Sequence, residues 1–186
     1  MNFFEDNTTQ EEIILKKCFD CLVDIGLEHA TIRTLCQATG LKATSIYYRF
    51  SNKEEIVLEA TVWGFKNVTR SICWSVIQKT ESFKELFDGL FEKIEANKKQ
   101  LKFIYQVAGS PRYGELLRAR AKGLDTLYVS FTTKLAEEIG CADADLLPYV
   151  RLFVSVVREY VLWDDKELVE KNLQFIYSRA LRLRGK

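Results

Sequence analysis

The stretch that decides the fold is residues 31–56, TIRTLCQATGLKATSIYYRFSNKEEI. Apolar residues recur in it at helical spacing, around Leu35 in its first half and at Ile46 and Phe50 in its second, and Gly40 separates the two halves. Two short helices joined by such a turn form a helix-turn-helix, whose second helix enters the major groove of DNA. The stretch therefore predicts a DNA-binding unit.

The predicted outward face of the second helix combines small residues, hydroxyl groups and aromatic rings with polar tips. These positions are Lys42, Ala43, Thr44, Ser45, Tyr47 and Tyr48. Arg33, Arg49 and Lys53 flank this face, and residues 29–53 contain four basic and no acidic side chains, although the whole chain has a net charge of only +1. Cations in this arrangement are suited to neutralising DNA phosphates. A helical hairpin with solvated tyrosines is the plainer alternative.

The neighbouring segments supply the rest of a small three-helix core. Thr9 and Glu12 form a capping box that begins a helix over about 9–25, which Gly26 ends. Short helices follow, from Thr31 to Thr39 and over about 42–49. Either Ser51 with Glu54 or Asn52 with Glu55 begins a longer helix that runs to about residue 75.

The remaining sequence predicts helices only. Apolar residues at helical spacing indicate further helices over about 82–94, 101–108, 115–139, 146–163 and 165–183, with Asp143 or Asp145 as the cap of the fourth of these. We therefore expect an all-α chain of about nine helices. It divides into a small N-terminal domain, residues 1–52, and a larger helical domain, residues 53–186.

Other classes of protein find little support. No apolar run is long enough to span a membrane and the N-terminus lacks a signal-peptide pattern, so we expect a cytoplasmic protein without a membrane partner. We see no nucleophile elbow and no phosphate-binding glycine loop, and expect neither an enzyme nor a cofactor. Cys18 and Cys21 form a CxxC, but they lie inside a predicted helix. With His29 as the only histidine, no metal site is expected.

Residues 31–56 resemble the DNA-binding signature of the TetR family of bacterial transcriptional regulators. Positions in register with it are Thr31, Ile32, Leu35, Gly40, Leu41, Ser45, Ile46, Tyr47, Phe50, Lys53, Glu54 and Ile56. The resemblance covers about residues 26–60. Cys36, Lys42 and Thr44 stand where the family usually has alanine, a capping serine and glycine. Loss of the serine cap is expected to weaken the start of the reading helix by about 1 kcal/mol.

The resemblance implies roles for individual residues. It implies phosphate contacts at Thr31, Tyr47, Tyr48 and Lys53, base contacts at Lys42, Ala43, Thr44 and Ser45, and a further DNA contact at Arg33. It also implies a dimer that binds a double-stranded, palindromic operator and a larger domain that binds a small effector and dimerises. The expected function is a ligand-responsive regulator, in the family's usual form a repressor that leaves its operator when the effector binds.

Two further sets of residues follow for the larger domain. Its aromatic residues suggest a pocket for an apolar or aromatic effector, although they could equally form the core: Trp63, Trp74, Phe87, Phe91, Phe103, Tyr105, Tyr128 and Phe131. Two apolar stripes suggest the homodimer interface, although they could equally be buried within one chain: Val150, Val154, Val157 and Val161, with Leu173, Ile176, Ala180 and Leu183. A helical adaptor or carrier without operator binding, and a cysteine-based redox sensor on the same scaffold, stay open as alternatives.

Overall fold

The computed structural model describes residues 9–77, 83–120, 129, 132–133, 135–137 and 139–183, and for residues 73–77 and 83–88 it describes the backbone only. All secondary structure in these ranges is helical, which confirms the predicted all-α class. The helices are α1 (Gln10–Ile25), α2 (Ile32–Thr39), α3 (Ala43–Tyr47), α4 (Lys53–Ile77), α5 (Phe83–Ala96), α6 (Lys98–Gly109), α7 (Gly114–Arg120), α9 (Asp143–Trp163) and α10 (Lys166–Ala180), followed by the 3₁₀-helix η2 (Leu181–Leu183).

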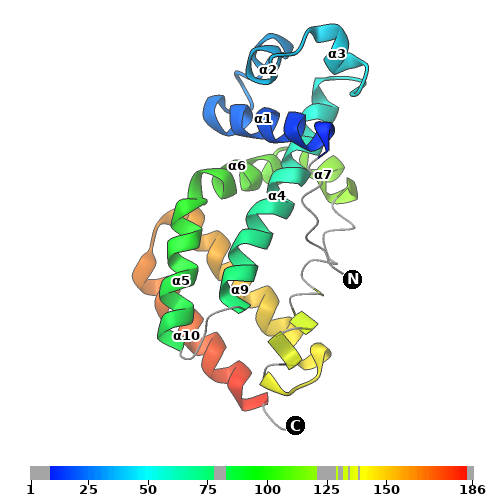
Figure 1. The fold of residues 1–186 in the computed structure, drawn as a ribbon. Helices are drawn as coiled ribbons and strands as arrows, with labels where there is room; N and C mark the ends of the chain where they lie inside the picture. Colours follow the sequence, from blue (N-terminus) through cyan, green and yellow to red (C-terminus); the bar gives the residue numbers. More distant parts are fainter. Residues whose placement is uncertain are drawn as a thin grey trace.

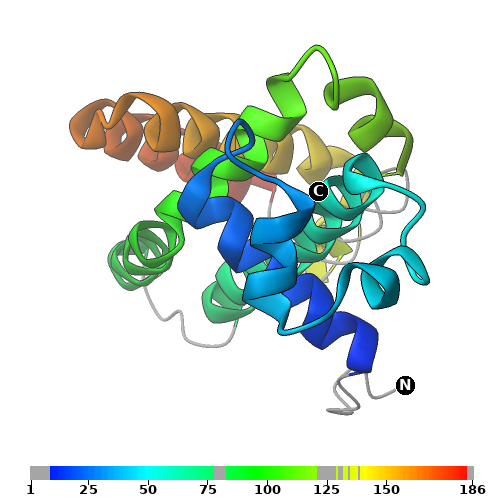
Figure 2. The same cartoon turned by 90° about the horizontal axis from the view of Figure 1, so that it is seen from above.

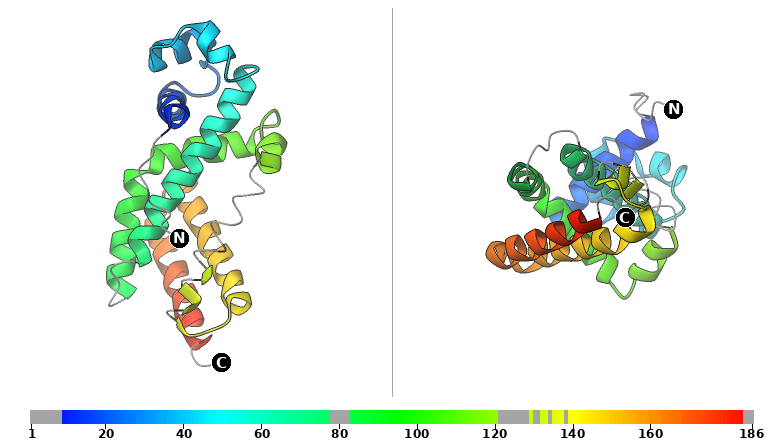
Figure 3. Two further views of the ribbon diagram at one scale, coloured as in Figure 1. Left: turned by 45° about the vertical axis from the view of Figure 1, so that its right-hand side comes forward. Right: turned by 90° about the horizontal axis from the view of Figure 1, so that it is seen from below.

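The first three helices gather at one end of the molecule, and we call α1–α3 the head (Figure 1). Helix α4 leaves the head and runs into the rest of the chain, the body, while α6 crosses beneath α1. Figure 2 looks at the head from above, with α1–α3 in front of the body. At the other end α9 and α10 pack side by side as a hairpin, next to α5 (Figure 3).

Local capping signals position the helices of the head. The predicted box is present at the start of α1, where the Thr9 hydroxyl accepts from the Glu12 N–H at 3.2 Å and Glu12 Oε2 accepts from the Thr9 N–H at 3.0 Å. Gly26 ends α1 with a φ of 77°. Asn52, one of the two predicted caps, accepts from the Glu55 N–H at the start of α4 at 2.8 Å. These ends depend on neighbouring residues only, which is why the sequence predicts them.

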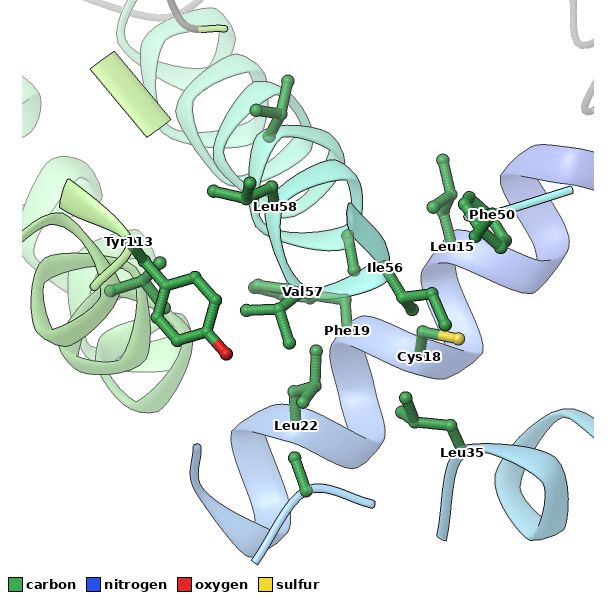
Figure 4. Close-up of a cluster of buried hydrophobic side chains, with 14 of the residues drawn as sticks. Leu15, Cys18, Phe19, Leu22, Leu35, Phe50, Ile56, Val57, Leu58 and Tyr113 are labelled. Carbon is green, nitrogen blue, oxygen red and sulfur yellow. The ribbon is translucent and has the colours of Figure 1, made fainter. Parts of the chain in front are cut away.

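Two hydrophobic cores hold the described residues together. The first core joins the head to the first half of α4 and to the second half of α6 with the connection that follows it. In Figure 4, Phe19 and Leu22 on α1 lie beside Val57 on α4, and Tyr113 reaches the cluster from the α6–α7 connection. The first core therefore crosses the predicted domain boundary after residue 52.

The second core lies in the body. It is formed by the second half of α4, by α5, by Leu101 of α6 and by the inner faces of α9 and α10. Since Phe103, Ile104 and Val107 of α6 belong to the first core, α6 packs into both cores. The two cores meet along α4 between Val62 and Val68. Two helices of the body, α4 and α6, therefore also contribute to the first core.

A polar cluster ties the α9–α10 turn to the α5–α6 junction. The Tyr160 hydroxyl donates to the Glu95 carboxylate, and Lys98 Nζ pairs with Glu95 Oε1 at 3.1 Å and also with Asp164. The ammonium group of Lys98 lies 4.4 Å from the centroid of the Tyr160 ring. Asp164 itself ends α9 in a left-handed conformation, with a φ of 67°. The cluster anchors the N-terminus of α6 to the hairpin.

The predicted dimer stripes are mostly buried within one chain, which is the alternative that the sequence left open for them. Six of the eight side chains are 9% exposed or less because α9 and α10 turn these faces toward each other and toward the second core: Val150, Val157, Val161, Leu173, Ile176 and Ala180. Val154 and Leu183 are half-buried. The exposed apolar side chains of the hairpin lie at other positions: Leu152, Leu162, Trp163, Leu168, Phe175 and, in η2, Leu181.

Two smaller expectations also differ. Ala142 is the N-cap of α9 and makes no side-chain cap bond, so Asp143 and Asp145 lie in the first turn, where their charge suits the positive end of the helix dipole. The predicted helix over 115–139 begins as α7, and much of its further course lies outside the described residues. In the described part of the chain, no helix has the length and apolarity needed to cross a bilayer.

Candidate nucleic-acid interface

Helix α3 is presented by a left-handed turn and held by two buried side chains. Gly40 ends α2 with a φ of 75°, a conformation that glycine adopts without steric cost. Ile46 and Phe50 are 1% and 3% exposed and bind α3 and the residues after it to the first core. The remaining sides of α3 are thereby turned away from the protein.

The outward face of α3 carries the residues that the sequence assigned to DNA. Tyr48 is 89% exposed and Tyr47 is 49% exposed. Lys42, Ala43 and Thr44 are exposed as well, and Ser45 is half-buried. Lys42 is the N-cap of α3 and makes no side-chain cap bond, as expected for a lysine at the position where the family has serine. Small, hydroxylated and aromatic side chains therefore share one accessible surface.

Thr31 and Lys53 are brought together although they are distant in sequence. The Thr31 hydroxyl caps α2 by accepting from the Thr34 N–H at 3.1 Å. Lys53, in the first turn of α4, reaches back so that Nζ donates to the carbonyl of Ala30 at 3.0 Å. An ammonium group thus lies beside the N-terminus of α2, where free N–H groups and the helix dipole favour an anion. The pair forms a candidate phosphate site.

The two arginines of the head lie on its exposed surface. Arg49 donates to the carbonyl of Ser45 at 3.4 Å and to Oε1 of Gln10 at 3.5 Å, so its guanidinium group spans from α3 to the first residue of α1. Arg33 is exposed on α2. Together with Lys42 and Lys53 they account for the positive charge of residues 29–53.

The acidic residues at the start of α4 are occupied by protein partners. Glu55 accepts from the Ser51 N–H at 2.6 Å, and this bond lowers the pKa of its carboxyl group. Glu54 pairs with Arg112 from the α6–α7 connection. Their negative charge is therefore partly compensated at the edge of the interface.

Sequence reasoning missed two residues where the head meets the body. Gly64 is buried in the middle of α4, and a Cβ atom there would overlap the ring of Phe19 on α1. Phe19 is 2% exposed, and its ring makes edge-on contacts with Trp63 and Phe103 at centroid distances of 6.0 and 5.9 Å. A glycine inside a predicted helix was the available signal, because such a glycine costs about 1 kcal/mol and marks close packing.

The residues assigned to an effector pocket do not form one group. Trp63 and Phe103 pack in or against the first core, whereas Phe91 and Tyr105 belong to or line the second. Phe91 lies 4.8 Å from the ring of Tyr160, and burial raises the pKa of the Tyr105 hydroxyl to about 12. The side chains of Trp74, Phe87, Tyr128 and Phe131 lie outside the described residues.

Three of the described cysteines, Cys18, Cys21 and Cys141, have the properties of structural thiols. Burial raises the pKa of Cys18 to about 12, and burial also raises the pKa values of Cys21 and Cys141. Since the thiolate is the reactive form, these thiols are poor nucleophiles at neutral pH. The side chain of Cys73 lies outside the described part of the chain. Within the described residues, no group of three or more metal-ligating side chains could hold an ion.

The N-terminal sequence matches a known family. Residues 14–60 match the family model described as "Bacterial regulatory proteins, tetR family", which spans α1 to the first turns of α4 and confirms the resemblance inferred above. The family consists of regulatory proteins, in agreement with the expectation that the chain is not an enzyme. No curated protein matches the chain significantly.

Solved structures share the fold over nearly the whole chain. A candidate transcriptional regulator from Rhodococcus sp. RHA1 has a TM-score of 0.67 at 14% identity, over 95% of this chain and 97% of its own. A TetR-family transcriptional regulator from Streptomyces coelicolor gives 0.58 at 14% identity over 92% and 97%. The TetR-family regulator PfmR from Thermus thermophilus gives 0.50 at 20% identity over 93% and 99%. The whole chain therefore has the fold of TetR-family regulators.

Proposed function

We propose that this chain, whose residues 14–60 carry the TetR-family DNA-binding region, is a transcriptional regulator that binds a palindromic operator as a dimer and responds to a small effector. The observation that carries the proposal is the outward face of α3, with Tyr47 and Tyr48 exposed beside Lys42 and Thr44. Phosphate contacts position a protein on DNA and base contacts give specificity. The head offers groups for both.

We propose a role in this interface for each predicted contact residue. We assign phosphate binding to Thr31 and Lys53 at the N-terminus of α2, to the tyrosine hydroxyls of α3 and to Arg33. We assign base reading to the first residues of α3: Lys42, Ala43, Thr44 and Ser45. Lysine and hydroxyl side chains can bond base edges in the major groove. The operator preference of this protein then depends on Lys42 and Thr44, which differ from the usual residues of the family.

A dimer is proposed because one helix-turn-helix covers a single half-site, and two half-sites lie about 34–36 Å apart. Because most residues of the two stripes are buried within one chain, we assign the contact to the outer face of the hairpin. Leu152, Leu162, Leu168 and Phe175 are 52%, 47%, 44% and 59% exposed there. Apolar side chains exposed on adjacent helices are typical of an interface between subunits.

The effector is proposed to bind in the body, against the second core. Tyr105, half-buried, packs against that core, and Phe91 is 4% exposed within it. Gln100, also on α6, has a buried Oε1 for which the described part of the chain provides no hydrogen-bond donor. Pockets for small ligands are mostly apolar with a few polar groups. An apolar or aromatic molecule with one donor group fits this chemistry, and we propose that its binding releases the operator, as in a repressor.

Selection of bound fragments from genomic DNA tests the proposal. The wild-type protein should enrich a palindromic site, and Tyr47→Ala should weaken its binding about tenfold or more in a gel-shift titration, because one phosphate or base contact is lost. Circular dichroism should show an unchanged fold, since Tyr47 is half exposed.

Lys171→Ala is a control for truncating an exposed side chain outside the head. Lys171 is exposed on α10, where it pairs with Glu167 at 2.6 Å, and its replacement should leave binding unchanged. Failure of the wild type to enrich any site, together with binding that does not change with salt, would refute operator binding and favour the helical adaptor.

A further inference from the structure

The contact between Phe19 and Gly64 joins three elements at one point. Phe19 projects from α1, Gly64 lies on α4, and the ring of Phe103 comes from α6. Gly64 is buried, and there is no space for a Cβ atom between α4 and the ring of Phe19. A glycine in a helix interior destabilises the helix by roughly 0.5–1 kcal/mol relative to alanine. The close approach of α1 to α4 is the structural gain that accompanies this cost.

Because of the position of Gly64 along α4, its contact with Phe19 can hold the orientation of the head. The other contacts of α1 with α4 include Ile56 and Val57, at the end of α4 that enters the head. Gly64 lies about two turns farther along α4, roughly 12 Å at 1.5 Å per residue. A contact at that distance resists tilting of the head about the start of α4 more strongly than one close to the pivot. It is also near Val62 and Val68, where the first core gives way to the second.

The polar links between head and body are weaker than this contact. Lys99 on α6 pairs with Asp24 on α1 at 2.6 Å, but both side chains are about two-thirds exposed. Lys53, at the start of α4, donates to the carbonyl of Ala30 at 3.0 Å, but this bond lies close to the pivot. Exposed ion pairs contribute little because water and salt screen them. The packed ring of Phe19, which is 2% exposed, is the stiffer connection.

We propose that Phe19, seated on Gly64 and against Phe103, fixes the angle of the head on the body and thereby sets the spacing between half-sites that the protein accepts. This inference rests on the proposed operator-binding dimer. In such a dimer, the contact of Phe19 with Gly64 and Phe103, which we call the seat of Phe19, sets the position of α3 in each protomer. A looser or shifted seat therefore changes the distance between the two α3 helices. Phe19 touches no DNA and is a positioning residue.

The test measures spacing and affinity separately. The operator enriched by the wild type is resynthesised with one or two base pairs added or removed between its half-sites, and binding is titrated for each duplex. The wild type should lose about tenfold or more in affinity at altered spacing, comparable to losing one base contact. Gly64→Ala adds a methyl group to the seat and Phe19→Leu removes the ring from it. At altered spacing, these variants should lose less than about threefold in affinity, or they should bind best at another spacing.

Three further variants complete the design. Gly89→Ala is the matched control, because Gly89 is also in a helix interior but has open space around its Cβ position, and it should keep the wild-type profile. The double variant Gly64→Ala with Phe19→Leu should recover part of the spacing discrimination, since the smaller side chain leaves room for the new methyl group. Phe19→Tyr, which keeps the ring, should discriminate better than Phe19→Leu.

The outcomes are distinct. Wild-type spacing discrimination in folded Gly64→Ala and Phe19→Leu overturns the inference and leaves operator binding intact, and if Gly64→Ala does not fold, Phe19→Leu alone decides. A wild type that binds its operator equally at every spacing also overturns it. A wild type that enriches no DNA removes the proposed function and this inference with it.

Discussion

Tyr48 in the head and Phe175 in the α9–α10 hairpin are both large exposed rings, 89% and 59% accessible. Their surroundings differ. Tyr48 lies next to Arg49, in a segment rich in hydroxyl and cationic side chains. Phe175 shares its helix surface with Leu168, and the centroid of its ring lies 5.2 Å from the guanidinium group of Arg179. Exposure alone does not identify a partner. The neighbours of an exposed ring distinguish a surface suited to DNA from one suited to another protein subunit.

The largest effect on stability is expected from placing a charge on the inner face of the α9–α10 hairpin, in comparison with the same change on its outer face. Val161→Asp should unfold the protein, because Val161 is 0% exposed and an unpaired buried carboxylate costs about 4 kcal/mol or more. Phe175→Asp should leave the fold intact and dissociate the proposed dimer. Thermal unfolding followed by circular dichroism, with light scattering for the mass, measures both. A folded Val161→Asp protein, or a Phe175→Asp protein that stays dimeric, would contradict the division between inner and outer faces.

The head offers a second comparison, between reading DNA and holding the fold. Thr44→Gly restores the glycine that is usual in the family and removes a side chain from the exposed face of α3. We expect a changed base preference at one operator position, worth about 1–3 kcal/mol, with overall folding nearly unaffected. Competition binding with a set of single-base operator variants measures the preference. An identical ranking of those variants would show that Thr44 does not read the sequence.

Lys42→Ser separates stability from binding in the same helix. A serine at the N-cap of α3 can accept a backbone N–H, which Lys42 does not, so unfolding should require about 0.5–1 kcal/mol more. The loss of one cation should reduce the slope of affinity against salt by about one charge. Denaturant unfolding and binding at several salt concentrations provide the two numbers. A decrease in the stability of Lys42→Ser would show that the absent N-cap hydrogen bond does not limit the stability of α3.

The smallest effect concerns the anchor of the hairpin and its pH dependence. The hydrogen bond from Tyr160 is the largest cause that lowers the pKa of Glu95 from its ordinary value of 4.5. A lowered pKa adds stability above the unfolded value, and that stability is lost as the pH falls below about 4.5 through the folded value. Glu95→Gln should therefore lose less stability than the wild type between pH 6 and 3. The side chain of Glu95 is 49% exposed, so the difference should be below about 1 kcal/mol.

That comparison has a clear control. Glu167→Gln on α10 removes an exposed carboxylate paired with Lys171, and its acid sensitivity should equal that of the wild type. If Glu95→Gln and the wild type lose stability in parallel on acidification, the Tyr160–Glu95 bond contributes nothing to the anchor.

The sequence predicted the head well because its signals are local. A capping box at Thr9, the cap at Thr31 and the left-handed Gly40 depend on residues within one helix end, and all are present in the structure. The exposed composition of α3 follows from the same short stretch. Charge, caps and turns can therefore be read without knowledge of what packs against them.

The body was harder because its packing depends on distant partners. Helix α9 has apolar residues on two faces, so periodicity could not tell the buried Val157 from the exposed Leu152. The aromatic residues divided between two cores for the same reason, and Trp63 and Phe103 serve the seat of Phe19. The place of α6 in both cores depends on contacts that no single segment encodes.

The first core also limits how this protein can exchange parts with its relatives. A chimaera made by joining residues 1–52 to the body of another protein of this fold would carry the complete helix α3. It would leave behind Gly64 and Phe103, which receive Phe19. The transplanted head would then expose or misplace a ring that is 2% accessible here. Productive recombination between such regulators should therefore occur beyond α6, so that head and seat are inherited together.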